Sequence, residues 1–204
     1  MKEIINFFST PYTGVTAFHI TLEIVAVFFG IASVLYAKKE NIWVFPTGII
    51  STVLYVYICY QFTLYGDVVI NLYYTLMSLY GWYVWNHKTS GQSIEITKSD
   101  PLDMLKALGI FISTAAFVVG VYLYYNRFDR LTDYFDTFTS GIFFAGMWLM
   151  AHKKIEHWMF WILGNLISIP LYFVKGLGFS GLQFTIFLVL AIQGYIEWKK
   201  HLNK

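Results

Sequence analysis

Three carboxamide side chains in otherwise apolar stretches are the residues whose chemistry is most informative. Asn71, Asn165 and Gln183 lie in three different helix-length apolar segments of this 204-residue sequence. A bilayer offers no hydrogen-bond donors or acceptors, so a carboxamide there must bond to protein or to a bound solute. Because a carboxamide both donates and accepts, three of them predict contacts with a neutral, hydroxylated or amide-bearing solute.

Aromatic residues accompany these carboxamides at helical spacing. In HWMFWILGNLIS, residues 157–168, a rotation of about 100° per residue places Trp161, Asn165 and Ser168 on one narrow arc. Tyr74 lies one turn beyond Asn71 on a second such arc. Aromatic neighbours suit a flat ring, and a cationic ring gains further from cation–π contact. The residues predicted to contact a ligand are therefore Trp161, Asn165, Asn71, Tyr74 and Gln183.

Several polar residues have a second interpretation, as hydrogen-bonding partners between packed helices. Such bonds contribute about 0.6–2 kcal/mol each in membranes. This interpretation is favoured for Ser78, Thr47 and Ser168, although Ser168 stays a candidate contact because it shares the stripe of Asn165. Glu23 is an acid well inside an apolar segment. It is equally a functional residue or a hydrogen-bond partner of His19 or of a neighbouring helix.

The composition places these side chains in a membrane protein. The chain is 57% hydrophobic and only 13% charged, roughly half the charged fraction of a soluble domain. Uncharged runs of about 20 residues match helices that cross a bilayer, and they lack the strict alternation of membrane strands. A net charge of +2 without a basic stripe excludes nucleic acid as a partner. With one cysteine, Cys59, neither an intramolecular disulfide nor a cysteine metal cluster is expected.

An all-α integral membrane protein with seven transmembrane helices is predicted from hydropathy, charge and turn signals. The predicted spans are 16–36, 42–61, 65–86, 105–125, 133–151, 156–174 and 179–198. Residues 1–15 are expected to form a peripheral segment, 87–104 a polar cytoplasmic linker and 199–204 a cytoplasmic tail. Within the linker, SDPLD predicts a helix start, with Asp100 as the cap, Pro101 at the first helical position and Asp103 in the first turn.

The distribution of Lys and Arg predicts the orientation of these helices. On the side of the N-terminus lie Lys2, Arg127, Arg130 and Lys175. On the opposite side lie Lys38, Lys39, Lys88, Lys98, Lys106, Lys153, Lys154, Lys199, Lys200 and Lys204. Because cytoplasmic loops are enriched in Lys and Arg, the N-terminus is expected outside the cell and the C-terminus in the cytoplasm.

Two stretches of the sequence indicate an internal repeat. Residues 37–57 are similar to residues 151–173, with Trp43 matched to Trp158, and the next spans end alike in GWYVW and GYIEW. Two three-helix units, 16–86 and 133–198, joined by the linking helix 105–125, must then run parallel. That 3+1+3 plan is SWEET-like, with the binding site at the repeat interface near the midplane. An aromatic-rich composition is the alternative explanation for the similarity of the two stretches.

Four tryptophans near the ends of the predicted spans are expected to anchor the protein at the membrane interface. They are Trp43, Trp85, Trp158 and Trp198.

The segments KKIEHWMFWILGNLIS, NLYY at 71–74, GWYVW and GYIEW resemble the PnuC family of bacterial vitamin transporters. The resemblance covers about residues 20–200. It implies uptake of nicotinamide riboside across the bacterial inner membrane by facilitated diffusion, without ion coupling or a cofactor. It also implies a homotrimer, and trapping of the vitamin by a cytoplasmic nicotinamide riboside kinase. Trp161 with Asn165, and Asn71 with Tyr74, resemble the family's substrate-binding motifs. Relatives carry thiamine or riboflavin, and these are the alternative cargoes.

Two other functional classes are alternatives to transport. A membrane-embedded enzyme would use Asp133 and Asp136 of DRLTDYFD to hold Mg²⁺. Diphosphate chemistry would need a second acidic cluster, which the sequence lacks, so no enzyme and no metal site is predicted. A retinal protein needs a lysine inside the last span, and residues 179–198 contain none.

Overall fold

The computed structural model describes residues 16–62, 65–87, 94–126, 128–174 and 178–202. The predicted peripheral segment 1–15 lies outside these ranges. Within them the chain is all-α, as predicted, with seven helices. They are α2 (Ala17–Lys38), α3 (Val44–Gln61), α4 (Tyr65–Asn86), α5 (Pro101–Tyr124), α6 (Leu131–Ala151), α7 (His157–Val174) and α8 (Gly178–Leu202).

The start of α5 forms the capping arrangement predicted from SDPLD. The Asp100 carboxylate accepts from the Asp103 backbone N–H at 2.7 Å, and the Asp103 carboxylate accepts from the Asp100 N–H at 3.2 Å. Pro101 occupies the first turn, where its missing N–H has no intrahelical partner to lose. The helix therefore begins at Pro101, ahead of the predicted span at 105.

Substituting this cap tests its contribution to stability. Asp100→Ala is expected to lower the free energy of unfolding by about 1 kcal/mol, because the Asp103 backbone N–H loses its acceptor and the reciprocal capping arrangement is broken. Thermal melting of the purified protein in detergent measures the change. Asp100→Asn is the matched control, since asparagine caps a helix about as well as aspartate. Equal melting temperatures for the alanine and asparagine variants would contradict the proposed capping role.

Helix α8 continues past the predicted end at Trp198. It runs to Leu202, so residues 199–202 belong to the helix and not to a separate tail. Lys199, Lys200 and His201 fill its last turn, where positive charge interacts favourably with the helix dipole. Neither glycine nor proline interrupts these residues, which explains why the helix persists beyond the apolar span.

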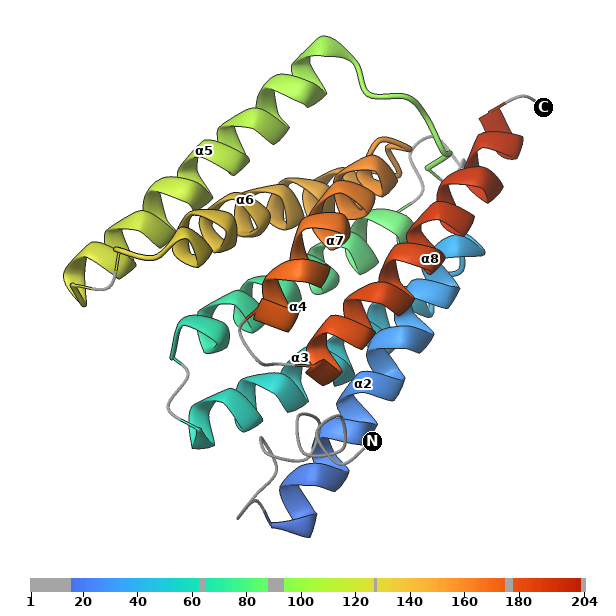
Figure 1. The fold of residues 1–204 in the computed structure, drawn as a ribbon. Coiled ribbons are helices and arrows are strands. Elements are labelled where there is room, and N and C mark those ends of the chain that lie inside the picture. Colours follow the sequence, from blue (N-terminus) through green and yellow to red (C-terminus); the bar gives the residue numbers. More distant parts are fainter. Residues whose placement is uncertain (1–15, 63–64, 88–93, 127, 175–177, 203–204) are drawn as a thin grey trace.

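The helices pack as two groups of three that share one internal order (Figure 1). In the first bundle, α3 packs against α2 and α4, and in the second bundle α7 packs against α6 and α8. The bundles meet through α2 with α8 and through α4 with α6, while α5 packs on α6. The first helix of each bundle thus packs against the third helix of the other. This arrangement is consistent with a 3+1+3 plan in which a two-fold axis relates the two bundles.

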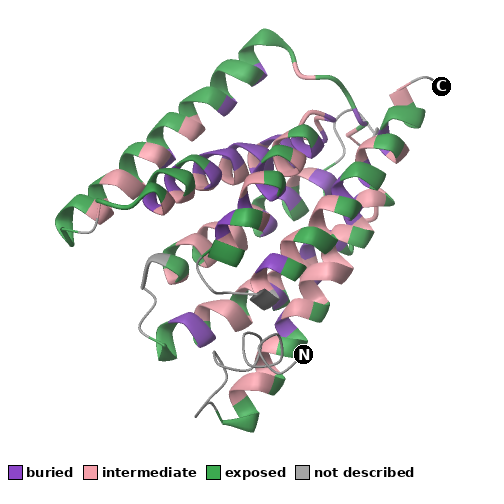
Figure 2. Ribbon diagram, viewed as in Figure 1, coloured by how far each residue is buried: buried purple, intermediate pink, exposed green. Residues whose placement is uncertain are grey.

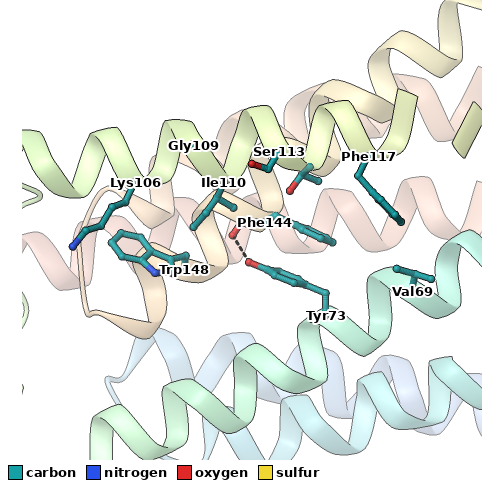
Figure 3. Close-up of a pocket in the computed structure, with 10 residues that line it drawn as sticks. Val69, Tyr73, Lys106, Gly109, Ile110, Ser113, Phe117, Phe144 and Trp148 are labelled. Carbon is teal, nitrogen blue, oxygen red and sulfur yellow. Dashed lines mark hydrogen bonds between the residues drawn. The ribbon is translucent and has the colours of Figure 1, made fainter. Parts of the chain in front are cut away.

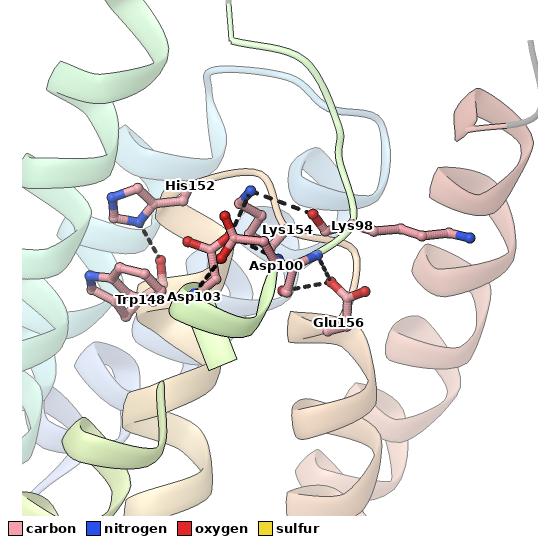
Figure 4. A network of polar contacts seen from close by, with 8 residues as sticks. Lys98, Asp100, Asp103, Trp148, His152, Lys154 and Glu156 are labelled. Carbon is pink, nitrogen blue, oxygen red and sulfur yellow. Dashed lines mark hydrogen bonds and ion pairs between the residues drawn. The ribbon is translucent and has the colours of Figure 1, made fainter. Parts of the chain in front are cut away.

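One end of the molecule gathers all of the described lysines. We call the end at which α2, α4, α6 and α8 finish the lysine-rich end. It carries Lys38, Lys39, Lys98, Lys106, Lys153, Lys154, Lys199 and Lys200. The chain that enters α5 is held there by the turn between α6 and α7. Thr97 bridges to Lys154, the Ser99 hydroxyl donates to Glu156 at 2.7 Å, and Lys154 pairs with Asp103 at 2.8 Å (Figure 4).

Five of the described helices are long and apolar enough to cross a membrane: α2, α3, α5, α7 and most of α8. Helices α4 and α6 are of similar length but are not among these five, and they form one of the two helix pairs that join the bundles. Buried residues concentrate along α6, whereas α5 is largely exposed (Figure 2). Asp133, Thr137 and Thr139 of α6 and Ser78 of α4 are among the buried polar residues.

One aromatic contact recurs at the same place inside each bundle, and it corrects two predictions. Phe45 packs on Trp85 and against Gly81, and Trp158 packs on Trp198 and against Gly194. These pairs share one sequence separation, so Phe45 is the counterpart of Trp158; the predicted match with Trp43 is wrong. Trp43 is 58% exposed, as expected of a membrane-interface residue. Interface anchoring is wrong for Trp85, Trp158 and Trp198, which are buried in the contacts within and between the bundles.

Candidate functional site

The polar stripe of α7 faces the protein interior, as predicted. Trp158, Asn165 and Ser168 are buried, and Trp161 is half-buried. Asn165 lies near the middle of the helix and is only 3% exposed, yet its carboxamide forms no hydrogen bond within the described part of the chain. A buried amide without a partner is unfavourable by about 1–3 kcal/mol, so this group is better suited to a ligand or a water molecule than to joining helices.

Trp161 lies where α7 crosses α6. A Cβ at Gly146 would lie 2.9 Å from both Cδ1 and Nε1 of the Trp161 indole, so the absence of a side chain there lets the ring approach α6 closely. On its own helix the indole stands nearly perpendicular to His157 and Trp158, with centroids 5.1 and 5.4 Å away. Gly146 therefore sets the position of this predicted ligand contact.

His157 adds a buried acceptor that the sequence did not single out. Its Nδ1 lies 2.8 Å from the Lys154 carbonyl, which can only accept, so Nδ1 carries the proton and Nε2 is a bare acceptor. Within the described residues neither this Nε2 nor the Trp158 Nε1 has a hydrogen-bond partner, and both are buried. His157, Trp161 and Asn165 recur every four residues, so polar groups follow one face of α7 from its start to its middle.

Tyr74 and Asn71 lie on α4, which packs against α6. Tyr73 stacks on Phe144 with centroids 3.7 Å apart and donates its hydroxyl to the Phe144 carbonyl at 3.0 Å. Tyr74 meets the same phenylalanine edge-on, and it packs on the core cluster that Trp161 also contacts. Asn71 is half-buried, and its Nδ2 donates to the Asp67 carbonyl of its own helix at 2.8 Å. One of its two donors is therefore used locally.

Glu23 and Gln183 gather around a residue that the sequence reasoning missed. Tyr55 of α3 is hydrogen-bonded to Gln183 of α8 and lies near Glu23 of α2. Tyr57 and Gln61 of the same helix are exposed, whereas Thr47 and Ser51 are buried. Counting in fours from the buried Thr47 through Ser51 would have found Tyr55, because such steps stay on one helix face.

The seven predicted contacts thus fall into two groups. Trp161, Tyr74, Asn165 and Ser168 lie near the middle of the helices, and Asn71, Glu23 and Gln183 lie toward the end opposite the lysine-rich end. Together they offer carboxamides, hydroxyls and aromatic faces, which suit a flat ring carrying hydrogen-bonding groups. The middle group combines an aromatic wall with an amide that has no partner in the described ranges, and it is the stronger candidate for the binding centre.

A groove of about 620 Å³ lies elsewhere, between α4, α5 and α6 (Figure 3). Lys106 and Trp148 lie at one end, Phe117 and Val69 at the other, and the Tyr73–Phe144 pair between them. None of the seven predicted contacts lines it. Its walls are mainly apolar, and its position beside the exposed helix α5 separates it from the polar stripe of α7.

The acidic residues considered for metal binding are engaged in local bonds. Asp133 accepts from the Arg130 backbone N–H at 2.9 Å at the start of α6, and Asp136 accepts from the Tyr122 hydroxyl at 3.1 Å. In the ranges that the structure describes, no three His, Cys, Asp or Glu residues come together as a metal site would require. These aspartates cap and brace the connection between α5 and α6.

Most of the chain is similar to known transporters. The model of a family described as nicotinamide mononucleotide transporter matches residues 20–200. The nicotinamide riboside transporter PnuC of Escherichia coli is 24% identical over 202 residues, covering 87% of this chain and 84% of the relative. The protein of the same name from Neisseria mucosa is 30% identical over 190 residues, covering 88% and 72%.

A third relative and a solved structure complete the comparison. The riboflavin/roseoflavin transporter RibM of Streptomyces davaonensis is 26% identical over 174 residues, covering 83% of this chain and 80% of the relative. The fold is similar to that in a crystal structure of the vitamin B3 transporter PnuC, with a TM-score of 0.70 and 22% identity, over 96% of this chain and 86% of that one.

Proposed function

Because this chain belongs to the PnuC family of vitamin transporters, we propose that it carries nicotinamide riboside into the bacterial cell. Its membership makes it a multi-pass membrane transporter of a small vitamin and not an enzyme. The observation that carries the choice of site is the buried Asn165 carboxamide, which lies one turn from Trp161 and has no hydrogen-bond partner among the described residues. A nicotinamide amide or a ribose hydroxyl supplies the hydrogen bond that this side chain lacks.

The proposed binding arrangement uses both groups of polar residues. The pyridinium ring lies between Trp161 and Tyr74, where a cationic ring gains from the aromatic faces. Its amide bonds to Asn165, and the ribose hydroxyls reach Asn71 and Gln183. Ser168 is a further contact in the middle group. Glu23, in the group toward the end opposite the lysine-rich end, supplies a negative charge that complements the cationic ring.

The charge distribution favours the nucleoside over its phosphorylated form. A phosphate is bound by Lys, Arg or clustered backbone N–H groups. The lysines and the one arginine of the described residues lie near helix ends or in the connections, and none lies near Asn165 in the middle of α7. A nucleotide would therefore leave its phosphate without a cation in this centre, whereas the riboside carries no such charge.

The proposed mechanism is alternating access by movement of the two bundles around this centre. Uptake is facilitated diffusion, and a cytoplasmic kinase traps the vitamin by phosphorylation. The protein lies in the bacterial inner membrane as a homotrimer, with its N-terminus outside and its lysine-rich end in the cytoplasm. Uptake into proteoliposomes that depends on an imposed pH gradient would contradict facilitated diffusion and would assign proton coupling to Glu23.

Titration calorimetry of the detergent-purified protein tests the cargo. Nicotinamide riboside is expected to bind saturably, whereas thiamine and riboflavin give no heat at the same concentrations. The similarity to RibM makes riboflavin a necessary competitor in this experiment. Saturable binding of thiamine or riboflavin without nicotinamide riboside would overturn the proposed cargo and keep the transport class. Nicotinamide mononucleotide serves as the charge control, and we expect it to bind at least about tenfold more weakly because its phosphate finds no cation.

A further inference from the structure

Two turns at the lysine-rich end hold non-glycine residues in a left-handed backbone conformation. Glu40 follows α2 with φ of 54°, and Lys153 follows α6 with φ of 51°. Side chains with a Cβ adopt this region only at an energetic cost, so the surrounding structure must favour it. Since α2 and α6 are the first helices of the two bundles, these turns occupy corresponding positions in the repeat.

The two left-handed residues form an ion pair with each other across the bundle interface. The Lys153 ammonium lies 2.5 Å from the Glu40 carboxylate and 4.5 Å from the centre of the Trp85 ring. Lys153 is only 6% exposed, and the Glu40 side chain is 26% exposed. Removing the carboxylate would leave a largely buried ammonium with only the indole face opposite it.

Two indole bonds cross the same interface in corresponding positions. The Trp85 Nε1–H donates to the Ala151 carbonyl at 3.2 Å, and the Trp198 Nε1–H donates to the Ala37 carbonyl at 2.9 Å. The accepting carbonyls lie in the last turns of α6 and α2, and the Ala37 carbonyl also accepts from the Glu40 backbone N–H at 3.0 Å. Each bundle therefore caps a helix end of the other.

Two further side-chain hydrogen bonds join the bundles beside the Glu40–Lys153 pair and the indole bonds. The Tyr80 hydroxyl lies 3.1 Å from His152 Nε2, and the Lys38 ammonium donates to Gln193 at 2.8 Å. His152 Nδ1 must donate to the Trp148 carbonyl 2.9 Å away, so its Nε2 accepts from Tyr80. All five polar contacts join the first bundle to the second, and we call them together the inner clasp.

The connection to α5 belongs to one side of this interface. Thr97, Ser99 and Asp103 bind the turn between α6 and α7, so the start of α5 is tied to the second bundle (Figure 4). Separation of the bundles at this end would break the inner clasp and leave those bonds intact. The clasp is therefore the set of polar bonds at this end that opposes opening.

We propose that the Glu40–Lys153 ion pair is the gate on the lysine-rich side, and that it must break before a solute leaves the binding centre toward that side. The pair is the ionic contact of the clasp. Each partner is positioned by its own turn, in which the Asn41 N–H donates to the Tyr36 carbonyl and the Lys154 N–H donates to the Leu149 carbonyl, both at 2.9 Å. This proposal rests on the proposed function in assuming that the bundles move apart during transport.

Cysteine labelling at Ser78 tests the gate without a substrate. Ser78 is 3% exposed, on α4, two turns before Trp85. In a Cys59→Ala background, a membrane-impermeant thiol reagent added to the lysine-rich side is expected to label Ser78→Cys slowly. Glu40→Gln and Lys153→Met are each expected to raise the labelling rate at least about fivefold, because the closed state loses its ionic contact. The charge swap Glu40→Lys with Lys153→Glu is expected to bring the labelling rate most of the way back to the slow rate of Ser78→Cys in the Cys59→Ala background.

The pair Glu197–Lys200 provides the matched control. It lies at the same end, 2.8 Å apart, and both of its residues belong to α8. Glu197→Gln and Lys200→Met should leave the labelling rate of Ser78→Cys unchanged. Unchanged labelling in Glu40→Gln, or equal increases in the control variants, would overturn the gate. Where Glu40→Gln does not fold, Glu40→Asp applies the same test, with a smaller increase expected. Since no vitamin is added, failure of the cargo titration and failure of the gate are separate results.

Discussion

Asn165→Leu is expected to weaken the binding of nicotinamide riboside about 10- to 100-fold, while the empty protein stays as stable as before or becomes more stable. Asn165 is buried and has no hydrogen-bond partner within the described residues. Leucine has a similar size and removes an unsatisfied polar group. This change is expected to raise the free energy of unfolding of the ligand-free protein by about 1 kcal/mol or more. A bound amide or hydroxyl loses its partner in the same substitution, which weakens binding by about 10- to 100-fold.

The contrast between binding and stability separates a ligand contact from a helix–helix contact. Ser51 provides the opposite case, since its buried hydroxyl donates to the Ala26 carbonyl at 2.8 Å and joins α3 to α2. Ser51→Ala is expected to lower stability by about 1 kcal/mol with binding unchanged. Calorimetric titration and thermal melting of both variants give the two readouts. A loss of stability in Asn165→Leu with binding intact would make Asn165 a structural residue.

The fold could be predicted largely because a bilayer restricts the possible structures. Apolar runs of sufficient length must be helices, so seven helices followed from hydropathy, and the start of α5 followed from SDPLD. The family followed from motifs in two of those helices, in agreement with the matched family and relatives. The end of α8 was misplaced because hydropathy reports where the membrane ends and says little about where a helix ends.

The tryptophans show what a single sequence does not contain. Interface anchoring and core packing both place Trp near helix ends, and only the partners distinguish them. Trp198 finds the Ala37 carbonyl, and Trp85 finds the Ala151 carbonyl, across an interface between residues far apart in sequence. The match of Trp43 with Trp158 failed for the same reason, because it compared residue types, whereas the repeat preserves a buried aromatic position opposite glycine.

The candidate site was predictable by helix face and less so by side-chain partner. The stripe of α7 lies inward as its spacing predicts, with Asn165 and Ser168 buried. Spacing alone could not show that Asn71 uses a donor on its own helix, or that Gln183 and Glu23 meet at Tyr55. Such bonds depend on the rotation of neighbouring helices, which a one-dimensional pattern leaves undetermined. The roles of these residues in binding stay predictions for the experiments above.

Gly194→Ala is expected to be the most destabilising of the single substitutions proposed for this chain. A Cβ at Gly194 would lie 2.5 Å from Cζ2 of Trp158 and closer still to its Cη2. Trp158 is fully buried between His157 and Trp198, with ring centroids 4.4 and 5.8 Å away, so the indole has no space to move. Overpacking of this kind destabilises by about 1–3 kcal/mol. Here it also displaces Trp198, which bonds the other bundle.

A control and a rescue make the cause of this loss identifiable. Gly120 lies on exposed α5, and a Cβ there would have nothing within 4 Å, so Gly120→Ala is expected to be neutral or stabilising by up to about 1 kcal/mol. In the Gly194→Ala background, Trp158→Phe removes the outer indole atoms that overlap the new methyl group, and part of the lost melting temperature should return. The two changes must therefore be non-additive, as expected for residues in direct contact. If Gly194→Ala melts like Gly120→Ala, α7 and α8 do not approach as closely as this packing requires.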